Sequence, residues 1–143
     1  MALPKPEPGL VLNYTYLWHD EHRRGQEEGR KVRPSVIVVN VARASDGAAM
    51  ITVLPITHTI PVDPKMAVEI SPAVKRHLSL DDARSWIVLD EGNEFFWPGY
   101  DLRKRLKSGR YEYGFLPPRL FDRVREAFVA VNATGQGRIS PRG

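Results

Sequence analysis

Two short apolar segments of this chain, residues 33–40 and 50–59, carry polar groups that are suited to act on a phosphodiester. The polar groups are Arg33, at the start of the first segment, and Thr57, His58 and Thr59, at the end of the second. A guanidinium can stabilise a phosphoryl group through paired hydrogen bonds at a fixed charge. Hydroxyls and an imidazole can donate and accept protons beside it. The chemistry requires that the two segments meet at one end.

Both segments are predicted to be buried β-strands, because β-branched residues dominate a continuous apolar stretch in each. The connection between them, residues 42–49, is too short for a crossover, so the strands are expected to pair antiparallel. Antiparallel pairing brings the start of one strand beside the end of the other. Arg33 and Thr57 are therefore expected to lie near each other at one end of a sheet.

The remaining elements are short and mostly extended. Strands are predicted over residues 10–18, 67–70 and 85–90, a short helix over 72–78 with Ser71 as its N-cap, and an amphipathic helix over 116–132. This pattern favours a mainly β fold, a strongly bent antiparallel sheet or partly open barrel with short helices and a C-terminal α-helix.

The 143 residues are enough for one domain with its own core. Residues 1–9 are rich in proline and are expected to form an extended lead-in. Residues 10–132 form the predicted domain, and residues 133–143, polar and rich in glycine, are predicted to be a flexible tail.

Composition narrows the class of protein further. The absence of cysteine excludes disulfides and thiolate metal sites. No apolar run approaches the roughly 20 residues that span a bilayer, and the N-terminus has no apolar signal-peptide core, so a cytoplasmic protein that does not engage a membrane is expected. The net charge of +4 favours acidic partners such as nucleic acid.

Five short motifs occur in an order and spacing that are jointly distinctive. They are Pro8-Gly9-Leu10-Val11, a charged loop with Gly25 and Gly29, Arg33-Pro34, Pro55-Ile56-Thr57, and Tyr113-Gly114-Phe115-Leu116 before the C-terminal helix. Over residues 8–131 the chain resembles the PemK/MazF family of type II toxin–antitoxin toxins. The resemblance implies an SH3-like barrel that usually forms a homodimer.

The same resemblance implies a metal-independent endoribonuclease that cleaves single-stranded RNA through a 2′,3′-cyclic phosphate and needs no cofactor. Arg33 and Thr57 match the catalytic arginine and threonine of the family. A cognate antitoxin is the implied protein partner, and DNA is implied only indirectly, through that antitoxin.

The charged loop over residues 19–31 supplies the other catalytic candidates. Glu28 is a candidate base, and His19 can serve as acid or base because an imidazole titrates near neutrality. The expected RNA contacts are Arg23, Arg24, Lys31, His58 and Thr59. His58 follows Thr57 directly, so on a regular strand it points to the opposite face and is structural, unless the strand has already ended at Thr57. No metal is expected, because His19-Asp20-Glu21-His22 lacks the helical His-Glu-x-x-His spacing.

Three alternatives stay open. The aromatic residues within 95–100 either stack on bases or form a core plug or dimer surface. The basic residues within 101–110 either track phosphates, meet an acidic antitoxin tail, or simply form a solvated face. The alternative function for the whole protein is that of a non-catalytic barrel protein, either a gyrase-directed poison like CcdB or a degenerate toxin that only binds a partner protein.

Overall fold

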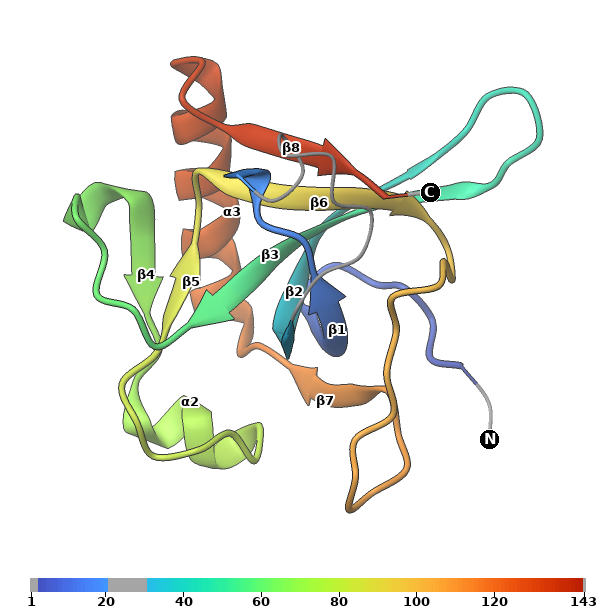
Figure 1. Cartoon of the computed structure of the whole chain (residues 1–143). Helices are drawn as coiled ribbons and strands as arrows, with labels where there is room; N and C mark the ends of the chain where they lie inside the picture. Colours follow the sequence, from blue (N-terminus) through green and yellow to red (C-terminus); the bar gives the residue numbers. More distant parts are fainter. Residues whose placement is uncertain (1–2, 21–30, 143) are drawn as a thin grey trace.

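The computed structural model of the protein describes residues 3–20 and 31–142, and the strands within these residues form one curled sheet (Figure 1). The strands are β1 (Leu10–Tyr16), β2 (Lys31–Ala42), β3 (Ala49–Thr57), β4 (Ala67–Glu69), β5 (Trp86–Val88), β6 (Glu91–Phe96), β7 (Glu112–Phe115) and β8 (Arg138–Pro141). The helices are η1 (Pro64–Met66), α2 (Pro72–His77) and α3 (Pro118–Ala133). The mainly β fold class with a C-terminal helix is confirmed.

The sheet has the order β4-β5-β3-β2-β1-β7, and β6 joins it by pairing with β3. One edge of β3 pairs with β2 along most of its length. Its other edge pairs first with β6, over residues 50–53, and then with β5, over residues 56–57. The strands that flank β3 therefore diverge, and this divergence curls the sheet.

The two chemistry-bearing segments pair antiparallel, as predicted. β2 and β3 are in register from Ser35 opposite Pro55 to Ala42 opposite Ala49. A tight turn closes the connection, in which the Gly47 amide donates to the carbonyl of Arg43 at 2.7 Å. The register shifts between Ile37 and Val39, well away from the end that carries Arg33.

Each face of the sheet has its own hydrophobic cluster, because successive strand side chains alternate between faces. On one face, Val11, Val36 and Leu54 pack against the buried stripe of α3, which includes Val124 and Phe128. The opposite, inner face carries Leu10, Leu12, Tyr14, Tyr16, Ile37, Ile51, Val53, Phe95 and Leu102. The predicted active residues belong to the strand ends that border this inner face.

The two helices follow their sequence signals closely. α2 begins after Ser71, whose hydroxyl accepts a hydrogen bond from the Val74 amide at 3.3 Å, with Pro72 in the first turn. α3 also begins with a proline, Pro118, which needs no amide partner in the first turn. The longest helix in the described part of the chain is α3. No helix in this part is long and apolar enough to cross a membrane.

The C-terminal segment differs from the prediction. Residues 138–141 form β8, which pairs in parallel with β6, where a flexible tail was expected. The reason is a long-range ion pair. Arg142 donates to both carboxylate oxygens of Asp101, at 2.9 and 3.0 Å, and both side chains are almost completely buried. The polar, glycine-rich composition of this segment gives no sign of the ion pair between Arg142 and Asp101.

Candidate active site

Strand register places four polar side chains on the inner face at one end of the sheet. Tyr14 pairs with Arg33 across β1 and β2, and Tyr14 belongs to the inner cluster. The β2–β3 register, continued by two residues beyond Ser35, sets Arg33 opposite Thr57. Tyr16 is two residues beyond Tyr14 and therefore lies on the same face.

Arg33 is half-buried and lies over an aromatic ring. Its guanidinium carbon is 4.9 Å from the centroid of the Trp18 ring, a cation–π geometry. The same residue lines a cavity of about 190 Å³, together with Lys31, Pro34 and His58. The stacked ring restricts the arginine while leaving it on the wall of a cavity.

Thr57 is the last residue of β3 and is buried, with 9% of its surface exposed. Its hydroxyl oxygen accepts a hydrogen bond from the Thr59 amide at 3.2 Å, so the chain turns directly after the strand. Thr57 lines a second cavity, of about 370 Å³, whose wall also includes Trp18 and Glu91. Trp18 thus contacts Arg33 and also borders the Thr57 cavity, so the same ring links the two residues.

Glu91, the first residue of β6, joins this site and was not predicted from the sequence. Its carboxylate accepts hydrogen bonds from the His19 amide at 2.5 Å and from the Tyr16 hydroxyl at 3.4 Å. Burial raises the pKa of the Glu91 carboxyl to about 7, and the two hydrogen bonds oppose that rise only in part. Burial also raises the pKa of the Tyr16 hydroxyl well above its usual value. A carboxyl that titrates near neutrality is suited to proton transfer.

A buried amide fixes the chain after β1 against β6 and so positions Glu91. Asn93, completely buried, accepts a hydrogen bond from the Leu17 amide at 2.9 Å and donates one to the Leu17 carbonyl at 2.8 Å. Asn93 and Glu91 are two residues apart and face the same side. The two hydrogen bonds between Asn93 and Leu17 place the following residues, Trp18 and His19, beside the site.

His19 lies beside Glu91 through its backbone, as the preceding hydrogen bond shows. Among the described residues its ring nitrogen Nδ1 is buried and has no hydrogen-bond partner. The structure therefore brings His19 to the same end of the sheet as Arg33 and Thr57.

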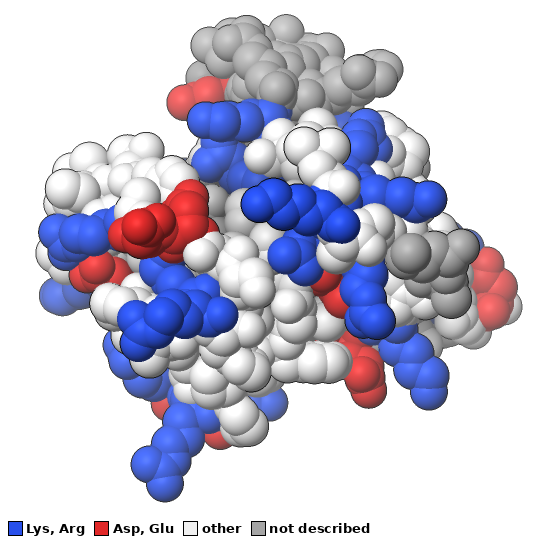
Figure 2. Space-filling view, turned by 90° about the horizontal axis from the view of Figure 1, so that it is seen from below, with Lys and Arg blue, Asp and Glu red and all other residues white. Residues whose placement is uncertain are grey.

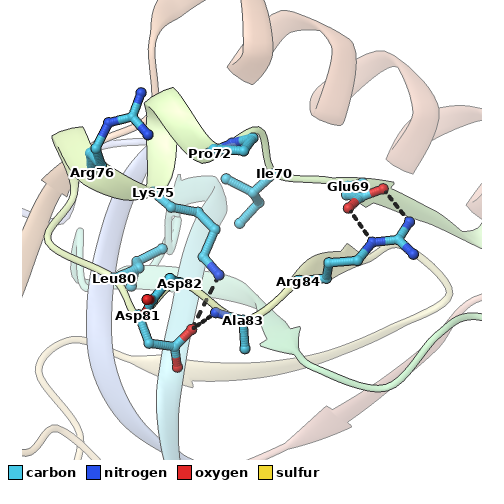
Figure 3. Close-up of a pocket in the computed structure, with 10 residues that line it drawn as sticks. All are labelled: Glu69, Ile70, Pro72, Lys75, Arg76, Leu80, Asp81, Asp82, Ala83 and Arg84. Carbon is cyan, nitrogen blue, oxygen red and sulfur yellow. Dashed lines mark hydrogen bonds and ion pairs between the residues drawn. The ribbon is translucent and has the colours of Figure 1, made fainter.

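His58 points away from the cavity of Thr57 and contacts Asp81 instead. β3 ends at Thr57, so His58 lies in the turn, and its Nε2 is 2.9 Å from the Asp81 carboxylate. Asp81 also accepts a hydrogen bond from the buried Lys75 at 3.1 Å (Figure 3). His58 contributes to the Arg33 cavity from its rim.

The other predicted RNA contacts are divided between described and undescribed residues. Lys31, the first residue of β2, and Thr59 are both exposed beside the cavities. Glu28, Arg23 and Arg24 lie outside the described residues, as do Glu21 and His22. Within residues 3–20 and 31–142, no group of three or more His, Asp or Glu side chains is placed to hold a metal ion.

The aromatic group after β6 belongs mainly to the core. Phe95 is buried and its ring centroid is 5.2 Å from that of Tyr14, in a stacked arrangement. Trp97 packs at the edge of the same cluster. The core interpretation of these aromatics is confirmed for Phe95, and Tyr100 remains half-exposed.

The signal for Glu91 in the sequence is weak but present. Glu91, Asn93 and Phe95 alternate with the period of a strand, which is a pattern of one face of a sheet. Nothing in this short polar segment reveals that it pairs with β3, 40 or more residues earlier, as in Asn93 opposite Val53 or Phe95 opposite Ile51. Only the pairing brings its carboxylate to the site.

Comparison with known proteins gives one match. Residues 16–131 match a protein family described as PemK-like, MazF-like toxin of type II toxin-antitoxin system. The matched range includes Arg33, Thr57 and Glu91. Searches of curated proteins and of solved structures give no match.

Proposed function

The chain belongs to the PemK-like, MazF-like toxin family of type II toxin–antitoxin systems, and we propose that it is a metal-independent endoribonuclease that cleaves single-stranded RNA. Membership of a type II toxin family implies a protein antitoxin as partner. The proposed substrate includes messenger RNA. We therefore propose that the protein acts in the cytoplasm and that its cleavage of messenger RNA inhibits growth.

One observation carries the proposal: a guanidinium, a hydroxyl and a carboxyl that titrates near neutrality gather at one end of the sheet. Thr57 and Glu91 border one cavity together with Trp18, and the Arg33 guanidinium lies over the ring of that same Trp18. Cleavage of RNA by its own 2′-hydroxyl needs a base, an acid and charge stabilisation at phosphorus. The site offers a side chain for each requirement.

Glu91 is the proposed base. Its carboxylate takes the proton from the 2′-hydroxyl, the 2′-oxygen forms a bond to phosphorus, and the bond from phosphorus to the 5′-oxygen breaks. A base with a pKa of about 7 is half-ionised at neutral pH and still accepts a proton readily. The products are a 2′,3′-cyclic phosphate and a 5′-hydroxyl.

Arg33 and Thr57 are proposed to stabilise the negative charge that develops on the phosphoryl oxygens. The arginine donates a pair of hydrogen bonds and keeps its charge at every working pH. The Thr57 hydroxyl, whose oxygen accepts from the Thr59 amide, has its proton free to donate. His19 is the proposed acid, which gives its proton to the departing 5′-oxygen.

The remaining partners follow from the family resemblance and the surface around the site. Lys31 and Thr59 are exposed beside the cavities and are proposed to contact RNA, with Arg23 and Arg24 on the loop outside the described residues. We also propose a homodimer, which sedimentation equilibrium of the purified protein would measure.

The first experiment is incubation of the purified protein with a long unstructured RNA in the presence of EDTA, followed by mapping of the ends. We expect discrete cuts with 2′,3′-cyclic phosphate and 5′-hydroxyl ends, and we expect Arg33→Ala to abolish them. Arg43→Ala is the matched control, because Arg43 also stacks on a ring, that of Phe96 at 4.1 Å, but lies on the turn beyond β2.

Two results would reject the enzyme. Undiminished cleavage by Arg33→Ala would remove the arginine from the reaction. Intact RNA with the wild-type protein, shown to be folded and free of antitoxin, would favour the alternative of a toxin relative that only binds a partner protein.

A further inference from the structure

A strongly basic loop projects from the sheet between β6 and β7 (Figure 1). This basic loop, residues 103–110, carries Arg103, Lys104, Arg105, Lys107 and Arg110, and no acidic residue. The nearest acidic residue before it, Asp101, is already paired with Arg142. Figure 2, which views the molecule from below, shows Lys and Arg side chains spread across that side.

The base of the basic loop is fixed to the middle of β1. The Arg103 amide donates to the Asn13 carbonyl at 2.9 Å, and the Asn13 amide donates to the Tyr111 carbonyl at 2.7 Å. Within the loop, the Arg105 amide donates to the Arg110 carbonyl at 2.8 Å. These bonds give the charged loop a defined position relative to the sheet.

The side chains of the basic loop are not neutralised by acidic neighbours. None of its five basic residues forms an ion pair with any described residue. The Arg105 guanidinium lies over the Tyr113 ring at 4.2 Å, while Lys104 and Lys107 are exposed. Such a concentration of unpaired charge attracts a polyanion.

The basic loop forms one wall of a groove that leads to the proposed reaction centre. The groove has a volume of about 730 Å³, and its lining includes four basic residues of the loop, Arg103, Lys104, Arg105 and Lys107. Val32, Leu80 and Asp81 line both the groove and the cavity of Arg33. The two hollows therefore share a wall, and a strand bound at Arg33 can continue into the groove.

We propose that the basic loop binds the phosphate backbone of single-stranded RNA beyond the scissile bond, as a second contact region separate from the catalytic groups. This inference rests on the proposed function, because the path of the strand begins at Arg33. A phosphate chain is favoured over an acidic peptide because the groove opens directly from the site that handles a phosphodiester. The loop would supply affinity without reading sequence.

The test measures binding, without cleavage, by fluorescence anisotropy over a series of salt concentrations. The probe is a labelled oligonucleotide with 2′-O-methyl groups, which has no nucleophile and stays intact. In the double variant Lys104→Gln/Lys107→Gln, we expect the slope of log affinity against log salt to fall in magnitude by about 1.4, at roughly 0.7 for each lost phosphate contact. The loss of affinity should grow with the length of the oligonucleotide.

Arg123→Gln/Arg138→Gln is the matched control, since it removes the same charge from exposed positions on α3 and β8. We expect its salt slope to equal that of the wild type. An unchanged slope in the loop variant, or equal losses in both variants, would overturn the proposal. Binding of polyglutamate at the loop in place of RNA would also overturn the proposal.

The outcomes separate this proposal from the proposed enzyme. Cleavage by the wild type together with an unaltered salt slope in the loop variant would refute the basic loop alone. A reduced slope in a protein that leaves RNA intact would support the loop and refute the endoribonuclease.

Discussion

Two carboxylates of this protein each lie beside a tyrosine of β1, and their surroundings differ in one respect. Asp101 lies beside Tyr14, at 3.5 Å, and is held by both hydrogen bonds of the Arg142 guanidinium. Glu91 lies beside Tyr16 and accepts hydrogen bonds from neutral donors only, among the described residues. Asp101 is paired with a full charge, whereas Glu91 is not.

The difference explains why one carboxylate is structural and the other is a candidate for catalysis. A buried carboxylate whose two oxygens both accept hydrogen bonds from an arginine has its oxygens occupied by that pair. A buried carboxyl with only neutral donors has its pKa raised, here to about 7 for Glu91, and it opens onto a cavity. Asp101 and Glu91 are both carboxylates, so the difference between them comes from the pairing of Asp101 with Arg142 and not from residue type.

The largest expected effect comes from breaking the buried ion pair between Asp101 and Arg142. Asp101→Ala removes the buried carboxylate that binds both sides of the Arg142 guanidinium, so the free energy of unfolding should fall by about 3–5 kcal/mol, measured by urea denaturation. Asp46→Ala is the control, since it removes an exposed partner of Arg43 and should cost far less. Equal losses in the two variants would show that burial of the Asp101 pair has no special role.

Removing the carboxylate of Glu91 should lower the rate of RNA cleavage. Glu91→Gln keeps the shape of the side chain and should lower cleavage about 100-fold, because it removes the base. In the wild type the rising part of the pH–rate profile should have its midpoint near pH 7, where Glu91 loses its proton. A Glu91→Gln variant that retains this pH dependence would assign it to another group.

The hydroxyl opposite Arg33 should have a smaller effect. Thr57→Val keeps the β-branched shape but removes the donor to the phosphoryl oxygen, and cleavage should fall about tenfold. Thr52→Val, on the same strand but far from the cavities, is the control. If both variants cut RNA at the wild-type rate, the Thr57 hydroxyl has no role in the reaction.

The smallest expected effect is a pH dependence of stability that belongs to Glu91. Its pKa in the folded protein, about 7, lies above the ordinary value of 4.5 that an unfolded chain would show. The folded protein therefore binds more protons between these values, and its stability should fall as the pH rises from about 4.5 to about 7. Glu91→Gln should flatten this part of the curve in denaturant titrations at several pH values.

Local pattern was sufficient for much of the fold and for part of the site. Continuous β-branched runs and a short connection predicted β2, β3 and their antiparallel pairing, which are confirmed. Ser71 and the paired prolines before residue 119 predicted the starts of both α-helices. Arg33 and Thr57 were found because strand ends, polar types and the family motifs coincide at those two positions.

Tertiary structure alone decided the rest. Glu91 reaches the site because β6 pairs with β3 and because Asn93 binds Leu17, contacts that join residues 40 or more positions apart. His58 turns to Asp81 because the strand ends one residue before it. β8 is ordered because Arg142 finds Asp101, 41 residues away.

The physical reason is common to these cases. Strand and helix preferences depend on neighbours along the chain, so the sequence determines them directly. The pKa of Glu91 and the charge pairing of Asp101 depend on burial and on partners supplied by distant segments. The sequence by itself therefore determined most of the elements, the family and three of the proposed catalytic groups, while the fold decided that Asp101 is paired with Arg142 and that Glu91 faces a cavity.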